Sequence, residues 1–97
     1  MNNSQWIATY LEAQAAEFGA SNNTQMAYAR DLKGFADWVD QRELTFGEVA
    51  REDVEDYMVF CDSEGLAKST RARRLSAIKQ LFRFAFEEGW RETNPAI

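Results

Sequence analysis

The amino-acid sequence predicts an all-α fold, a compact bundle of four helices formed by one domain over residues 1–97. Four segments repeat apolar residues at intervals of three and four, the spacing of a helix with one buried face. The chain has only five glycines and one proline, too few for the many turns of a β-rich fold. Its 97 residues are close to the lower limit at which a single hydrophobic core forms comfortably.

The first two helices are expected at about residues 5–18 and 22–40. Ser4 is a plausible N-cap after a frayed stretch of residues 1–4, and Gly19 is a C-terminal stop. The polar run that follows Gly19 predicts the start of the second helix, where free N–H groups either receive ordinary side-chain caps or bind phosphate. The apolar faces contain Trp6, Ile7, Tyr10, Leu11 and Phe18 in the first helix, and Tyr28, Leu32, Phe35 and Val39, flanked by Trp38, in the second.

Residues 40–50 form the longest connection, and a third helix is expected at about residues 51–64. Three apolar residues of the connection should pack on the core: Leu44, Phe46 and Val49. The apolar spacing of the third helix places Val54, Tyr57, Met58 and Cys61 on its buried face. Its acidic residues are expected on a solvated face, and Gly65 should end it.

A fourth helix, at about residues 68–88, combines a buried stripe with most of the positive charge of the chain. Residues 66–86 contain six basic residues and no acidic one, although the net charge of the chain is −5. Such a helix is either a solvated face or a surface that meets a large anion such as nucleic acid. The stripe contains Leu75, Ile78, Leu81, Phe82, Ala85 and Phe86, and Gly89 and Trp90 should close the helix and return the chain to the core.

Composition argues against several classes of function. The chain has no histidine, which excludes Ser-His and Cys-His catalytic pairs and His-based zinc sites, and it has the single cysteine Cys61. The carboxylates are expected at exposed positions, with no buried acid pair, so we predict no cofactor and no enzyme activity for this domain by itself. The sequence contains no apolar run of the roughly 18–20 residues that a membrane span needs and no signal peptide, which fits a cytoplasmic protein.

Three segments in order resemble one known family. They are Ser21-Asn22-Asn23-Thr24 continuing to Trp38, Glu52-Asp53-Val54 continuing to Tyr57, and Gly65-Leu66 continuing to Gly89, followed by Asn94-Pro95-Ala96. This pattern is similar to the SAM-like N-terminal domain of tyrosine recombinases and phage integrases, in particular the Xer-type recombinases. The resemblance extends over about residues 5–97.

This resemblance implies a core-binding domain that closes on duplex DNA opposite a larger catalytic domain, which is absent from these residues. The expected partners are duplex DNA and other recombinase protomers in a synaptic tetramer, with no membrane and no small-molecule ligand. The tyrosines of this chain match helix core positions and are not expected to be the nucleophile. By position, the DNA-binding residues would be Asn23, Thr24, Lys68, Ser69, Thr70, Arg71, Arg73, Arg74 and Lys79.

Two departures and two alternatives accompany this interpretation. Ala50 and Ala67 stand where the family often has Thr or Ser, so the third and fourth helices should begin without a side-chain cap. A helical module that docks its basic helix on an acidic protein is the main alternative function, because the fold alone does not choose between the two. A free-standing enzyme is the third and weakest reading.

Overall fold

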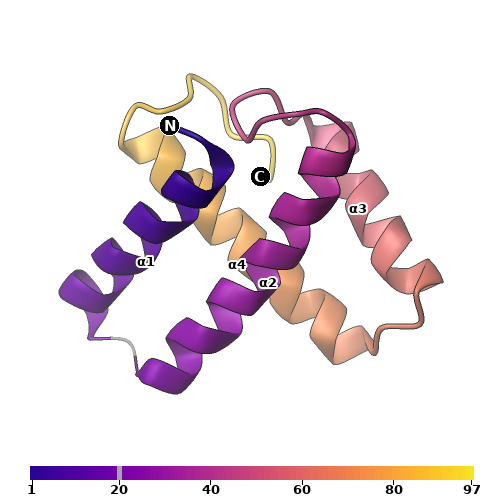
Figure 1. The fold of residues 1–97 in the computed structure, drawn as a ribbon, viewed down its shortest axis with the longest axis horizontal. Helices are drawn as coiled ribbons and strands as arrows, with labels where there is room; N and C mark the ends of the chain where they lie inside the picture. Colours follow the sequence, from indigo (N-terminus) through magenta and orange to yellow (C-terminus); the bar gives the residue numbers. More distant parts are fainter. Residues whose placement is uncertain (20) are drawn as a thin grey trace.

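The structure, a computed structural model, describes residues 1–19 and 21–97 and confirms the predicted all-α fold. Its helices are α1 (Asn3–Phe18), α2 (Asn22–Gln41), α3 (Arg51–Ser63) and α4 (Lys68–Glu87), and the described residues contain no strand. Figure 1 shows α2 and α4 crossing at the centre, with α1 on one side and α3 on the other. No helix in this part of the chain is long and apolar enough to cross a membrane.

The start of α1 differs from the prediction, because Asn3 and Ser4 belong to the helix and Asn2 is its cap. Asn2, not Ser4, is the N-cap: its side chain accepts a hydrogen bond from Gln5 N, and the Gln5 side chain accepts one from Asn2 N, both at 2.8 Å. This reciprocal pair satisfies two backbone donors that would otherwise be free. The predicted apolar role of Phe18 lies outside the described side chains.

The other helix ends agree with the expected capping chemistry. Ser21 Oγ accepts a hydrogen bond from Thr24 N at the start of α2. Ala50 and Ala67 give no side-chain cap to α3 and α4, as predicted. Gly89 has φ +77°, and Trp90 N donates to Ala85 O over 2.8 Å, which closes α4 in a Schellman motif.

An aromatic cluster around Phe35 of α2 forms the centre of the core. The Phe35 ring lies 5.5 Å from Phe46, 5.0 Å from Tyr57 and 6.2 Å from Phe82, measured between ring centroids. Phe86 does not join this core, contrary to the prediction from spacing, because it is 48% exposed near the end of α4. Besides Phe35, Tyr57 and Phe82, the predicted stripes contain these buried residues: Trp6, Tyr10, Leu32, Val39, Val54, Cys61, Ile78, Leu81 and Ala85.

The connection between α2 and α3 is fixed to both terminal regions. Phe46 and Val49 are fully buried, as predicted for this segment. Asn3 Oδ1 accepts a hydrogen bond from Phe46 N over 2.8 Å. Arg91 Nη1 donates to Phe46 O over 2.8 Å and to Val49 O over 2.7 Å. These bonds satisfy backbone groups that the irregular connection could not pair within itself.

Candidate nucleic-acid interface

The start of α4 is the most basic part of the molecule and lies on the same edge as the start of α2. Figure 1 shows the first turns of both helices diverging from their crossing point toward that edge. Lys68 and Ser69 are exposed on the first turn of α4, whereas Thr70 is half-buried. Arg71 Nη1 lies 2.8 Å from Asp62 Oδ1, an ion pair that joins the start of α4 to the end of α3.

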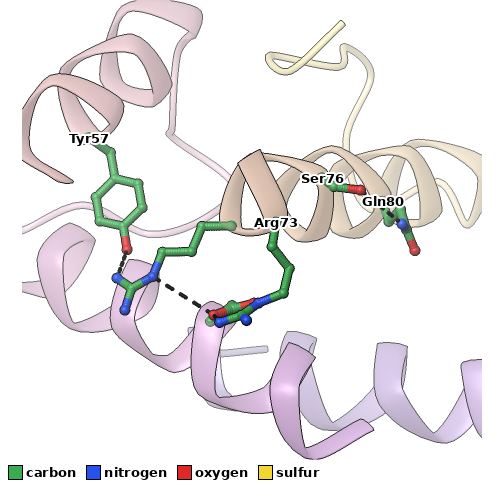
Figure 2. A network of polar contacts seen from close by, with 6 residues as sticks. Tyr57, Arg73, Ser76 and Gln80 are labelled. Atoms are coloured by element: carbon green, nitrogen blue, oxygen red, sulfur yellow. Dashed lines mark hydrogen bonds and ion pairs between the residues drawn. The ribbon is translucent and has the colours of Figure 1, made fainter. Parts of the chain in front are cut away.

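Arg73 pairs with a buried carboxylate on α2. Its Nε donates to Asp31 Oδ2 over 2.8 Å and its Nη2 to Asp31 Oδ1 over 3.0 Å, a two-point contact. Figure 2 shows the Arg73 side chain extending from α4 toward α2. The Asp31 side chain is fully buried, whereas the Arg73 side chain is 44% exposed. Hydrogen bonding to Asp31 raises the pKa of the Arg73 guanidinium, so Arg73 keeps its charge.

Asp31 therefore corrects the prediction that the carboxylates occupy exposed helix positions. A buried carboxylate is costly unless it is paired and hydrogen-bonded, and Arg73 together with the nearby Arg74 meets that need. At about 100° per residue, Arg73 lies on the side of α4 away from the apolar stripe. Its long side chain nevertheless reaches α2, which a helical wheel of α4 alone does not show.

Arg74 lies between α2 and α3. Its Nη1 donates to the Tyr57 hydroxyl over 3.0 Å, and its Nε lies 3.8 Å from Asp31 Oδ1, beyond hydrogen-bond distance. Burial raises the pKa of Tyr57 to about 12, so its hydroxyl stays protonated near neutral pH. Gly34 makes room for this arrangement, because a Cβ at that position would lie 3.3 Å from Arg74 Nη1. Arg74 is thus a partly buried link among three helices.

The remaining predicted residues occupy two different places. Asn23 and Thr24 are exposed on the first turn of α2, where the Thr24 hydroxyl also accepts a hydrogen bond from Ser21 Oγ over 3.0 Å. Lys79 lies farther along α4 and lines a groove with Arg51 of α3 and Ile97. The structure gathers Arg73 and Arg74 around Asp31 and leaves Lys79 apart from them.

Arg30 was not among the DNA-binding residues predicted from the sequence. Arg30 is exposed on α2, and no ion pair is found for it among residues 1–19 and 21–97. It follows Asn23 by seven residues, so both lie on one face of α2. The seven-residue spacing from Asn23 could have identified Arg30 as a candidate for the same surface. Arg30 also directly precedes Asp31 in the sequence.

A separate polar cluster fixes α1 against the far side of α4. Tyr10 donates from its hydroxyl to Gln80 Oε1 over 3.0 Å, and Gln80 Nε2 donates to Ser76 Oγ over 3.3 Å, as drawn for Ser76 and Gln80 in Figure 2. The described residues hold no cluster of His, Cys, Asp and Glu able to bind a metal ion. The side chains at the starts of α2 and α4 carry guanidinium, ammonium and hydroxyl donors, which suit recognition of an anion.

The family model described as "Phage integrase, N-terminal SAM-like domain" matches residues 7–89, and the chain belongs to this family. The chain is 34% identical over 91 residues to tyrosine recombinase XerD of Caulobacter vibrioides, covering 94% of this chain and 30% of that protein. It is 32% identical to tyrosine recombinase XerD of Rhizobium meliloti over 90 residues, covering 93% of this chain and 29% of that protein. The chain thus spans less than a third of these curated relatives.

Proposed function

We propose that this domain binds duplex DNA as the N-terminal, core-binding part of a site-specific tyrosine recombinase. The observation that carries the proposal is the start of α4, where Lys68 and the half-exposed Arg73 occupy a helix with no acidic residue between Glu64 and Glu87. The first turn of α2 adds neutral hydrogen-bond donors at the same edge. Family membership supports this choice, because the named relatives are recombinases.

The proposed contacts divide by chemistry. Lys68, Arg71 and Arg73 supply charge to phosphates, and Lys79 would meet the backbone farther along. Asn23, Thr24, Ser69 and Thr70 supply neutral donors, which position a duplex without reading its sequence. Arg74 is too buried to be a main phosphate contact, and its side chain instead links α4 to Tyr57 of α3. We propose that the 97 residues form one domain and that a separate catalytic domain of the recombinase performs strand cleavage. The proposed partners are other recombinase protomers in a synaptic tetramer. The proposed location is the cytoplasm.

The test is fluorescence anisotropy of this domain with a labelled duplex of about 30 base pairs, titrated across salt. Affinity should fall steeply with salt, because phosphate contacts release counterions. Lys68→Ala should lower the magnitude of the log–log salt slope by about one, the value for one lost phosphate contact. Arg42→Ala removes the same charge from the end of α2, at the opposite edge, where Arg42 pairs with Asp56 over 3.5 Å, and should leave the slope unchanged.

Absence of salt-dependent duplex binding, or equal slopes for Lys68→Ala and the wild type, would contradict the proposed interface. Retention of an acidic protein by the same basic helix, without duplex binding, would favour the interaction-module alternative. Both outcomes can be obtained with the same purified domain.

A further inference from the structure

Arg73 has hydrogen-bonding capacity that the protein does not use. A guanidinium carries five N–H donors, and Asp31 takes two of them, one from Nε and one from Nη2. No other hydrogen bond of Arg73 occurs within the described parts of the chain. Because the side chain is 44% exposed, the three remaining donors are open to solvent or to a bound anion.

Asp31 fixes the plane and direction of that guanidinium. Its carboxylate is fully buried in the middle of α2, within the tightly packed crossing of α2 and α4. A two-point contact to such a carboxylate restrains the guanidinium far more than a single hydrogen bond would. The rotamer freedom that an arginine ordinarily loses on binding a ligand is thus already lost before any ligand arrives.

We infer that Asp31 is a positioning residue of the DNA-binding surface, which holds Arg73 with its free donors ready for a phosphate. This inference rests on the proposed function and adds a role that charge alone would not suggest. An acidic group next to a phosphate site is expected to repel DNA. Here the buried carboxylate acts through the arginine that it orients.

Charge and positioning predict opposite results for Asp31→Asn. The substitution removes one negative charge, so an effect of charge alone would tighten binding to DNA. The amide cannot accept on both of its terminal atoms, so the two-point contact is lost and Arg73 becomes mobile. Positioning therefore predicts weaker binding, on the order of threefold to tenfold, together with a smaller salt slope.

The experiment compares Asp31→Asn with Asp37→Asn by anisotropy on the same duplex, at a temperature where circular dichroism shows every variant folded. Asp37 lies on α2, is exposed and, among the described residues, pairs with Lys33 alone, one turn earlier, so it matches the charge change without the positioning role. We expect weaker binding for Asp31→Asn, and equal or tighter binding for Asp37→Asn. Binding by Asp31→Asn that equals or exceeds the wild type would overturn the inference.

Two further measurements separate positioning from loss of fold. In an Arg73→Ala background, Asp31→Asn should no longer weaken binding, and an undiminished loss there would show that Asp31 acts otherwise. Arg73→Lys keeps the charge but lacks the planar fork, so it should weaken binding even if Asp31→Asn does not fold. Wild-type affinity in Arg73→Lys would overturn the inference. A wild-type domain without salt-dependent duplex binding would overturn both proposals, whereas an unaffected Asp31→Asn would overturn only this one.

Discussion

Gly34 of α2 faces the contact between Arg74 and Tyr57. In a helix interior, Gly→Ala ordinarily stabilises a protein by about 1 kcal/mol, because glycine loses more backbone freedom on folding. Here the new Cβ would lie 3.3 Å from Arg74 Nη1 and 3.5 Å from the Tyr57 hydroxyl. The Arg74 end group cannot move away freely, since Tyr57 holds it by a 3.0 Å hydrogen bond.

We therefore expect Gly34→Ala to give no gain in the free energy of unfolding in the wild-type background. In an Arg74→Ala background the obstruction is absent, and the full gain of about 1 kcal/mol should return. Urea unfolding followed by tryptophan fluorescence measures all four proteins of this cycle. An equal effect of Gly34→Ala in both backgrounds would show that the close approach has no energetic consequence.

Among the helices, α2 ends in a less favourable way than α3 and α4. Glu43 follows α2 with φ +60°, whereas Gly65 and Gly89 hold the corresponding positions after α3 and α4. Leu44 N donates to Val39 O over 3.1 Å, so the Schellman motif forms in spite of the side chain. A left-handed conformation costs a residue with a Cβ roughly 1–2 kcal/mol.

Glu43→Gly should relieve that cost and raise the free energy of unfolding by about 0.5–1 kcal/mol, after the greater flexibility of glycine in the unfolded chain is allowed for. Thermal unfolding measured by circular dichroism would show this as a higher Tm. Gly65→Ala is the matched control, because it introduces a Cβ at φ +79° and should lower stability by a similar amount. A lower Tm for Glu43→Gly would mean that the Glu43 side chain stabilises the folded state by more than the strain of its left-handed backbone destabilises it.

Across the whole molecule, helices and core follow from local sequence, and the polar links between helices do not. The spacing of Leu32, Phe35 and Val39 predicts a buried face because apolar residues recur there at intervals of three and four, within one short segment. The Asp31–Arg73 pair joins positions 42 residues apart, and nothing in the local pattern of either helix requires it. The hydrogen bonds of Asn3 and Arg91 were not predicted for the same reason, because each bonds to the backbone of Phe46, which is distant in the sequence.

Arg91 is the residue whose removal should affect the whole molecule most directly. Arg91→Ala leaves the carbonyls of Phe46 and Val49 buried without their donor, so we expect a loss of about 2 kcal/mol in the free energy of unfolding. Arg91→Lys should recover less than half of that loss, because a single ammonium replaces a fork that reaches both carbonyls. Urea unfolding of the two variants gives the comparison, and full recovery by lysine would contradict the two-carbonyl account.

The ties of Asn3 and Arg91 to the α2–α3 connection also bear on the order of folding. They join segments between 42 and 45 residues apart, and closing loops of that length costs chain entropy. The crossing of α2 and α4 spans a similar separation but is a hydrophobic contact between two long helices, whereas these ties are polar bonds to an irregular connection. We therefore expect the ties to form after the rate-limiting barrier. Stopped-flow measurements should then show Arg91→Ala unfolding faster while refolding at nearly the wild-type rate. Arg91 thus sets how long the folded state persists, and it has little influence on how quickly that state is reached.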